Sequence, residues 1–317
     1  MSEAQQTATT RVVVATIARP TGKTGVQTHF NTFLDYVRRS GQTPGLVTPF
    51  SAYPRLGAAI FAPRVLLARV SPSLDVWWYE HWHYVFLKLG LKRSLHGAGP
   101  CVVYAQCPIS AKAALESRDG PHQRVVMAVH FNVSQADEWA AQVNLSPASG
   151  VYRSIRERER RVLPAVDGLI YVSDFSRRMT LEAVPAAAGV PSAVLPNFVD
   201  APAEQPSRKP TRDLISIGTL EPRKNQAFLL HVLAAAAKRG HVYTLSVVGD
   251  GLERASLAAL AASLGIQEQV AFLGYQADAR RLMPDHRAYV HAARMENLPL
   301  SLIEAMAAGL PVFAAPV

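Results

Sequence analysis

The sequence predicts an α/β fold made of two Rossmann-like, doubly wound parallel-sheet domains that face a cleft. Short apolar runs rich in β-branched residues alternate with helix-length amphipathic segments along the whole chain. Such nearly continuous apolar strands are typical of parallel sheets that helices cover on both faces. The 317 residues suffice for two domains of ordinary size, and 49% hydrophobic with 18% charged residues is the composition of a folded globular protein.

Ten apolar runs are expected to form strands, five in each half of the chain. They are RVVVATIA, CVVYAQ, RVVMAV, GLIYVS and SAVLP, then DLISIG, YTLSVVG, QVAFLG, AYVHA and PVFAA. Segments between them, such as VQTHFNTFLDYVRR, have the apolar spacing of an amphipathic helix. We expect one Rossmann-like domain over 1–200 and a second over 213–317, joined by the Pro-rich, charged linker 201–212.

Composition and charge narrow the classes of partner. No run of 18 apolar residues occurs, and the N-terminal MSEAQQTATT lacks the basic and apolar parts of a signal peptide, so a cytoplasmic location is expected. The net charge of +9 is concentrated in residues 1–200, which suits phosphorylated ligands, an anionic membrane or nucleic acid. Nucleic acid is disfavoured because the basic residues are scattered and no aromatic residues are interleaved with them.

The stretch RPTGKTGVQTHF, residues 19–30, follows the first strand and ends like a phosphate-binding P-loop. A P-loop needs another glycine five positions before Gly22, where this sequence has Ile17. Two other interpretations stay open: a polar strand-to-helix loop, or a helix that begins at Gly25 and turns its unpaired backbone N–H groups toward a diphosphate or a sugar.

In the second half, GTLEPRKN places Arg223 and Lys224 between an expected strand and an expected helix. Two fixed cations at the start of a helix suit a diphosphate leaving group, on which negative charge grows as its bond breaks. A solvated basic pair at a turn is the alternative. Gly249 and Gly274 end the next two strands, and alone they would be ordinary turn glycines.

The segment ENLPLSLIEAMAAGLPV places Glu296 and Glu304 eight residues apart. Pro299 suits the first turn of a helix, so Glu296 is expected in the loop before that helix and Glu304 inside it. Carboxylates only accept hydrogen bonds when ionised and therefore bind sugar hydroxyls well. The alternative is a capping acid followed by a buried or paired helix residue.

Taken together, these segments resemble the retaining nucleotide-sugar glycosyltransferases of the GT-B fold, in the family 4 group that includes bacterial mannosyl- and glucosyltransferases. In the second half, the family's motifs are matched by Glu-x7-Glu, GTLEPRKN, VVGDGLER and VAFLGY. In the first half, TGVQTHF and VLPNFVD look like the family's glycine loop and the segment that closes its N-terminal domain. His130 falls where the family keeps a pocket histidine, and the resemblance makes Gly25 the working glycine of the loop.

The resemblance implies a hexosyltransferase that moves a hexose from a nucleoside diphosphate sugar to a glycan or lipid-linked acceptor, in bacterial surface polysaccharide synthesis. Catalytic roles are implied for Glu296, which hydrogen-bonds the transferred sugar, and for His130, near the reacting carbon. The implied substrate-binding residues are Gly25, Arg223, Lys224, Gly249, Gly274, Tyr275 and Glu304. Within this set, Arg223 and Lys224 hold the diphosphate and Glu304 the ribose. The resemblance also makes 1–200 the acceptor-side domain and 213–317 the nucleotide-sugar-binding domain.

No cofactor and no metal are expected beside the donor substrate. No Asp-x-Asp pair occurs in the chain, which disfavours the metal-using GT-A class. His81 and His83 lie two residues apart, on different faces of a helix and without a third ligand. Because family members continue past PVFAA, the second domain is expected to be truncated. A non-catalytic nucleotide-sugar-binding relative, or another GT-B enzyme such as a sugar-nucleotide epimerase, is the alternative function.

Residues 74–97 gather aromatic residues beside Lys88, Lys92 and Arg93 in a predicted helix. Tryptophan and tyrosine favour the headgroup region of a membrane and cations favour anionic lipid, so peripheral contact with the inner membrane surface is one interpretation. A helix packed on the N-terminal sheet is the other. The mixed-charge run 152–168 has helical spacing and is expected to be a solvated helix face.

Overall fold

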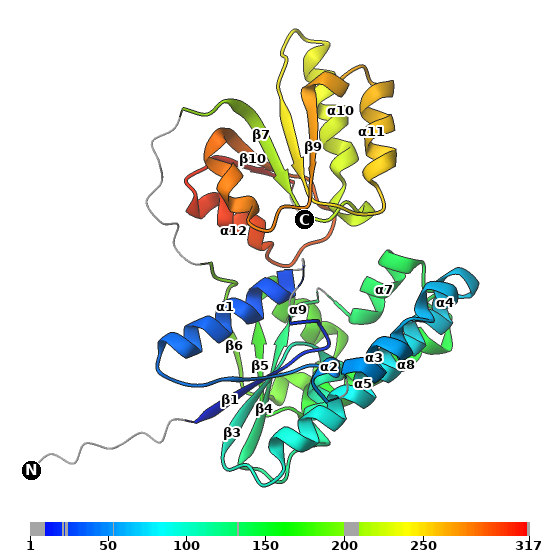
Figure 1. Ribbon diagram of the computed structural model, residues 1–317, viewed down its shortest axis with the longest axis vertical. Coiled ribbons are helices and arrows are strands. Elements are labelled where there is room, and N and C mark those ends of the chain that lie inside the picture. Colours follow the sequence, from blue (N-terminus) through cyan, green and yellow to red (C-terminus); the bar gives the residue numbers. More distant parts are fainter. Residues whose placement is uncertain are drawn as a thin grey trace, which may run out of the picture. The chain divides into compact units, whose positions relative to one another are not determined.

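The computed structural model describes residues 10–20, 22, 25–52, 54–131, 133–199 and 209–315. The chain divides into two compact units, Met1–Pro196 and Asn197–Val317, and each is a parallel sheet with helices (Figure 1). Residues 201–208 of the expected linker lie outside the described residues. The predicted α/β class with two parallel-sheet units is confirmed.

The first unit has a six-stranded parallel sheet with the order β2-β1-β3-β4-β5-β6. Its strands are β1 (Arg11–Ala15), β2 (Gly45–Val47), β3 (Cys101–Ala105), β4 (Gln123–Val129), β5 (Gly168–Tyr171) and β6 (Ser192–Val194). Five of them are the expected ones. The sixth, β2, was not predicted, because three residues that begin with a glycine carry too little apolar pattern to stand out.

In the described part of the first unit, nine α-helices connect these strands. They are α1 (Gly25–Arg39), α2 (Pro49–Ala52), α3 (Pro54–Phe61), α4 (Arg64–Val70), α5 (Pro72–Leu95), α6 (Pro108–Leu115), α7 (Gln135–Val143), α8 (Gly150–Val162) and α9 (Asp174–Ala183), with the short 3-10 helices η1 (Leu163–Ala165) and η2 (Pro185–Gly189). The long α5 has a clear start signal: Ser71 accepts a hydrogen bond from the Leu74 N–H, and Pro72 follows it.

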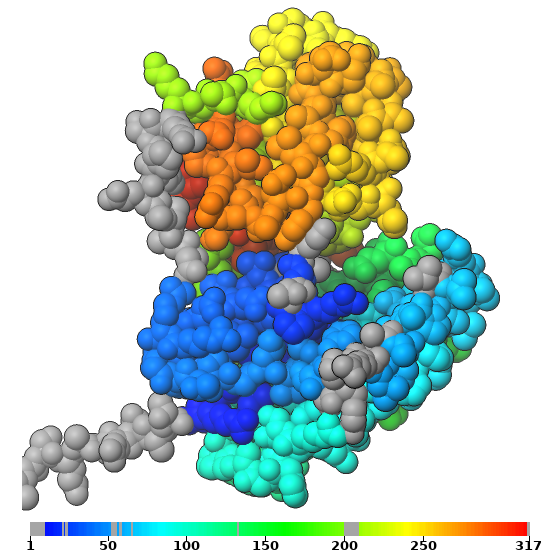
Figure 2. Space-filling model, in the orientation of Figure 1, coloured from blue at the N-terminus to red at the C-terminus, as the bar shows by residue number. Residues whose placement is uncertain are grey.

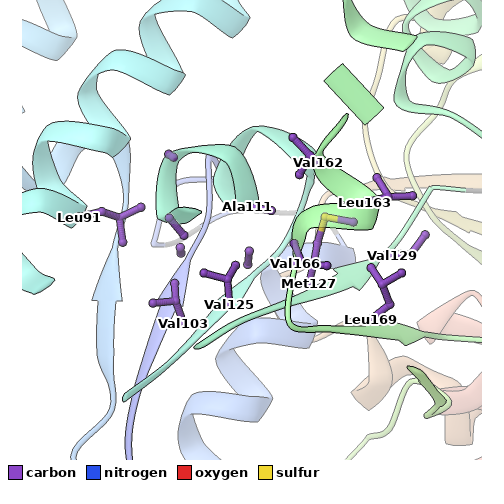
Figure 3. Close-up of a cluster of buried hydrophobic side chains, with 14 of the residues drawn as sticks. Leu91, Val103, Ala111, Val125, Met127, Val129, Val162, Leu163, Val166 and Leu169 are labelled. Carbon is purple, nitrogen blue, oxygen red and sulfur yellow. The ribbon is translucent and has the colours of Figure 1, made fainter. Parts of the chain in front are cut away.

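Alternating side chains of the first sheet form two cores, as the period of two in a strand requires. Val13, Val103 and Val125 belong to a core with side chains of α5, α6 and η1, of which Leu91, Ala111 and Leu163 are labelled in Figure 3. On the other face, Val14 and Ala128 pack with Phe30 and Leu34 of α1. Helices therefore cover both faces of the sheet, which leaves the carboxyl ends of the strands for a site.

The second unit has a five-stranded parallel sheet with the order β11-β10-β7-β8-β9. Its strands are β7 (Arg212–Ile217), β8 (Leu245–Val248), β9 (Val270–Gly274), β10 (His286–His291) and β11 (Val312–Ala314), and its helices are η3 (Pro222–Lys224), α10 (Gln226–Ala237), α11 (Arg254–Ser263), η4 (Gln267–Gln269), η5 (Ala279–Asp285) and α12 (Leu300–Ala307). Leu230 of α10 and Leu257 of α11 share one core, whereas Ala305 of α12 belongs to another with Tyr289. All five strands were predicted.

The aromatic residues of α5 mostly face the protein. Trp78 donates its Nε1–H to the Ile60 carbonyl, Phe86 is buried, and Lys88 forms an ion pair with Glu116. The interpretation of 74–97 as a helix packed on its own domain thus accounts for most of these side chains. Trp77 is an exception, being 47% exposed.

The expectation that 152–168 is a solvated face is wrong for one side of α8. Glu159 is buried and accepts hydrogen bonds from the Ser134 hydroxyl and the Gln135 N–H. Arg158 donates to Glu80, a buried residue of α5, at 2.8 Å. Charged residues of α8 therefore tie it to α5 and to the start of α7, which a helical charge pattern alone does not reveal.

Candidate active site

The sequence-predicted cations and the first predicted carboxylate meet in the second unit. Arg223 and Lys224 lie in η3, just after β7, and Glu296 lies in the loop between β10 and α12. Lys224 Nζ donates to Glu296 Oε1, and Arg223 Nη1 lies 3.4 Å from the same oxygen. The Glu296 side chain is only 12% exposed, so these charges interact in a partly desolvated setting where electrostatic attraction is strong.

Further contacts fix the position of Arg223. Its Nε donates to Glu221 Oε1 at 2.7 Å, and the hydroxyl of Thr219 donates to the same carboxylate oxygen at 2.9 Å. The Arg223 carbonyl accepts from the Arg294 N–H at 2.7 Å. These contacts pin the turn after β7 to the loop after β10, which explains why residues more than 70 positions apart form one cluster.

Glycine-bearing turns line the carboxyl ends of three neighbouring strands. The Gly218 N–H donates to the Val248 carbonyl, and the Gly249 N–H donates to the carbonyl of Gly274. Gly249 has a φ of +140°, and a Cβ there would lie 1.9 Å from the Gly218 carbonyl oxygen. Gly274 has a φ of +67°. Gly249 thus has a stronger reason than an ordinary turn, because the strand ends approach too closely for a side chain there, whereas Gly274 is required only by its positive φ.

We expect Gly249→Ala to lower the free energy of unfolding by about 3 kcal/mol or more, because it combines a strained backbone with a clash against main-chain atoms. Gly265→Ala is the matched control, since Gly265 has a φ of +70° but nothing within 4 Å of its would-be Cβ. We expect the control to lose only about 1 kcal/mol. Urea unfolding of both variants measures the difference, and equal losses would contradict this role of Gly249.

The second predicted carboxylate lies in α12, as the sequence predicted. Burial raises the pKa of Glu304, Arg280 lowers it and Asp278 raises it. The Arg280 Nε lies 4.0 Å from Glu304 Oε1. Pro299 is the N-cap residue of α12 rather than part of its first turn. Tyr275, directly after β9, is 41% exposed.

His130 follows β4 in the first unit and sits among polar side chains. Its Nε2 lies 2.9 Å from Gln106 Oε1, after the end of the neighbouring β3. Its ring meets the ring of His29, from α1, edge-on with centroids 4.7 Å apart. Burial, with a smaller contribution from His29, lowers the pKa of His130 to about 3. His130 is therefore a neutral imidazole at physiological pH, able to donate one hydrogen bond and accept another.

The predicted glycine loop leads directly into α1, which begins at Gly25 as expected. The preceding Gly22 is packed against Gln27, whose side-chain amide would lie about 2 Å from a Cβ at position 22. Gln27 in turn donates from Nε2 to the Arg19 carbonyl. Lys23 and Thr24, the other two residues of the P-loop likeness, lie outside the described residues.

Several site residues were not singled out from the sequence. Glu221 pairs with Arg223, and His291 lies behind Glu296 with a nitrogen-to-oxygen distance of 3.8 Å. His29 accompanies His130, and its Nε2 lies 3.0 Å from the Tyr104 hydroxyl. The position of these residues next to strand ends or in the first helix could have identified them as site residues, since the carboxyl ends of parallel strands lie at one edge of the sheet.

Among the described residues, no group of three or more His, Cys, Asp or Glu side chains is arranged to hold a metal ion. The cluster of Arg223, Lys224 and Glu296 can instead bind an anion through its cations and hydroxyl groups through its carboxylate. No helix among these residues is long and apolar enough to cross a membrane.

Two doubly wound units, one with paired cations and a carboxylate at its strand ends, define a two-domain α/β protein with side chains suited to an anionic ligand that also carries hydroxyl groups. The chain belongs to the glycosyltransferases: residues 23–201 match Glycosyltransferase Family 4 and residues 199–317 match Glycosyl transferases group 1.

Individual relatives agree with this assignment. The chain is 30% identical over 207 residues to the phosphatidyl-myo-inositol mannosyltransferase of Mycobacterium leprae, which covers 63% of this chain and 50% of the relative. It is 32% identical over 114 residues to the lipopolysaccharide core biosynthesis glycosyltransferase LpsE of Rhizobium meliloti, covering 36% and 31%. The chain thus matches half or less of the length of these curated relatives.

Among solved structures, HepE of Anabaena in complex with UDP and glucose superimposes with a TM-score of 0.64. The match covers 96% of this chain and 80% of HepE, at 17% sequence identity. At this identity the likeness shows the fold, and it confirms the predicted GT-B architecture.

Proposed function

We propose that the protein transfers a hexose from a nucleoside diphosphate sugar to a glycan or lipid-linked acceptor, with retention of configuration, in bacterial surface polysaccharide synthesis. The observation that carries the proposal is the cluster of Lys224, Arg223 and Glu296 at the strand ends of the second unit. The names of the two relatives, a phosphatidylinositol mannosyltransferase and a lipopolysaccharide glycosyltransferase, support an acceptor of this kind.

In this proposal Arg223 and Lys224 hold the donor diphosphate. Both are in ion pairs with Glu296 in the ligand-free protein, so the carboxylate occupies the place that phosphate oxygens take when the donor binds. The doubly charged diphosphate competes for the cations, and Glu296 is then available to accept hydrogen bonds from the sugar hydroxyls. Binding of the donor and release of the Glu296 carboxylate from the two cations therefore occur together.

The remaining donor contacts follow from position. Glu304, in α12, accepts from the ribose hydroxyls, and the chain around Tyr275 contacts the base. Gly249 and Gly274 add no side chain at the strand ends, so that the donor can approach the backbone of these turns closely. In the first unit, Gly25 gives the same access at the start of α1.

The reaction needs no nucleophilic side chain. The bond between the anomeric carbon and the phosphate oxygen breaks, and its electron pair passes to the nucleoside diphosphate. The acceptor oxygen bonds to the anomeric carbon on the same face, and its proton moves to the departing phosphate oxygen. Arg223 and Lys224 stabilise the growing negative charge, while neutral His130 hydrogen-bonds the sugar near the reacting carbon.

A thermal-shift panel of UDP, GDP, ADP and ATP, each with and without magnesium, tests the donor site. A ligand that binds only the folded protein raises its apparent stability. We expect a shift with one diphosphate that does not depend on magnesium. A shift with ATP and magnesium alone would support the P-loop interpretation of residues 19–30, and no shift with any nucleotide would refute the donor site.

We also propose that the first unit touches an anionic membrane surface through α3, α4 and the start of α5. Five exposed apolar side chains lie on these helices, which pack on one another: Leu56, Leu66, Val70, Leu74 and Trp77. The segment is blue to cyan in Figure 2. The acidic residues of the segment, Asp75 and Glu80, are buried and paired, whereas Arg69 is exposed. Apolar side chains with exposed positive charge suit anionic lipid.

Co-sedimentation with vesicles of phosphatidylglycerol and phosphatidylcholine tests this contact. We expect binding that weakens at high salt and falls about tenfold or more in the double variant Leu66→Ser, Val70→Ser, because burial of each side chain contributes on the order of 1 kcal/mol. Val242→Ser, at an exposed apolar position of the second unit, is the control. Absence of binding, or equal binding by the double variant, would refute the contact.

A further inference from the structure

His291 is a buried polar residue that lies directly behind Glu296. It is the last residue of β10, and only 6% of its surface is exposed. Its Nε2 lies 3.8 Å from Glu296 Oε1, and its Nδ1 lies 3.4 Å from the Tyr289 hydroxyl. Within the described part of the chain, the buried Nε2 has no hydrogen-bond partner. A buried nitrogen without a partner is costly, so its position next to a site carboxylate calls for an explanation.

The explanation lies in the exchange that donor binding requires. In the ligand-free protein, Glu296 Oε1 is held by Lys224 and lies 3.4 Å from Arg223 Nη1. When a diphosphate engages both cations, this carboxylate loses the partners that hold it, although it is only 12% exposed. A poorly hydrated carboxylate then needs another donor, and His291 Nε2 faces the same oxygen.

We propose that His291 is a positioning residue for Glu296: its Nε2–H becomes the hydrogen-bond donor that holds the carboxylate once the donor diphosphate engages Arg223 and Lys224. The inference rests on the proposed function, because it assigns those cations to the diphosphate. The distance has to shorten only from 3.8 Å to the usual hydrogen-bond length of about 2.9 Å.

The surroundings of His291 favour a neutral ring. Burial lowers the pKa of His291, the Glu296 carboxylate raises it, and the cations Lys224 and Arg223 lower it. On the opposite side of the ring, Nδ1 lies 3.4 Å from the Tyr289 hydroxyl. The proposal requires the proton on Nε2, and in that tautomer the hydroxyl donates to Nδ1 instead of to the Ile217 carbonyl or Ser301 Oγ. The Tyr289 hydroxyl also lies 2.7 Å from Ser301 Oγ, at the start of α12, so the ring is anchored to the helix that carries Glu304.

The test compares His291→Gln, whose side-chain amide N–H can take the place of Nε2–H, with His291→Phe, which fills the space without a donor. Each is made alone and in the Glu296→Gln background. Calorimetry with UDP and UDP-glucose, and with GDP and GDP-mannose, gives the affinities. Release of the diphosphate from the donor that binds gives kcat and KM.

We expect His291→Phe to lower kcat about 10- to 100-fold while the affinity for the diphosphate stays within about twofold. His291→Gln should recover most of the loss. In the Glu296→Gln background, His291→Phe should lower kcat little further, because the effects of two residues that act through one another are not additive. The inference is overturned if His291→Phe has the kcat of the parent, or if His291→Gln has a kcat as low as that of His291→Phe. It is also overturned if His291→Phe lowers kcat by the same factor in the parent and in the Glu296→Gln background.

A ligand-free measurement separates this inference from the proposed function. Titration of His291 by 15N NMR of the imidazole is expected to give a lower pKa in Glu296→Gln than in the parent, since the carboxylate raises it. Glu268→Gln, an exposed acid of the same unit, is the control and should change nothing. An unchanged His291 in Glu296→Gln overturns the inference. If Glu296→Gln turned over at the rate of the parent while the pKa of His291 fell as expected, the catalytic role of Glu296 would be refuted instead.

Discussion

Replacing Glu296 by glutamine is expected to lower glycosyl transfer by about 100- to 1,000-fold, the range seen when one electrostatic contact to a reacting centre is removed. The structure adds an expectation about binding. Because the carboxylate pairs with Lys224 and Arg223 in the ligand-free protein, its removal frees both cations, and the affinity for the nucleoside diphosphate should stay the same or increase. Turnover assays and calorimetry measure the two quantities separately.

Glu268→Gln is the control for this experiment, because it removes the same charge from an exposed position of the same unit. It should leave turnover and affinity unchanged. If Glu296→Gln turned over normally, Glu296 would not belong to the donor site. If Glu296→Gln lowered the affinity for the diphosphate by the same factor as the turnover, the carboxylate would serve only to position the cations.

The double variant Arg223→Ala, Lys224→Ala is expected to weaken nucleoside diphosphate binding by about 100-fold or more, because each charge-assisted contact to phosphate contributes on the order of 2 kcal/mol. Free sugar does not carry the diphosphate and should bind as before. High salt should reduce this difference in affinity less than it would for a variant at an exposed cation, because the Lys224 side chain is only 13% exposed and is therefore poorly screened.

Lys238→Ala, Arg239→Ala is the matched double variant, with the same change of charge on exposed residues after α10. It should bind the diphosphate like the parent. Because the site variant leaves Glu296 without its cations, its melting temperature must be measured, and Arg223→Ala, Lys224→Ala, Glu296→Gln also removes the unpaired carboxylate. Equal weakening of diphosphate and sugar, or equal effects of the two double variants, would contradict the phosphate role.

The sequence predicted the strands well because parallel strands buried on both faces are nearly continuous apolar runs. PVFAA, at the edge of the second sheet, is also an apolar run, although Phe313 and Ala314 of its strand are exposed. The strand Gly45–Val47 has no such run, and it pairs with β1 only through tertiary context. The helices α2 to α4 were also not separated in advance, since three short helices in one apolar stretch do not show distinct periods.

At the candidate site, the sequence predicted residue types and their places at strand ends, because Arg223 and Lys224 follow one strand and Glu296 another. It did not predict their partners. That Arg223 and Lys224 pair with Glu296 depends on side-chain geometry across more than 70 residues of sequence. Glu221 lies two residues from Arg223 and His291 five residues from Glu296, but which of these neighbours face one another depends on how the loops fold. Such pairings leave no local pattern.

The central claim, that this chain moves a sugar by means of the Glu296 site, is tested most directly by donor turnover. Purified parent protein and Glu296→Gln are incubated with UDP-glucose or GDP-mannose in the presence of a chelator, with and without lipid extract as acceptor, and released diphosphate is measured. We predict release from one donor by the parent, faster with acceptor, and loss of that release in Glu296→Gln. Equal release by both proteins, or no release from any donor, would contradict the claim.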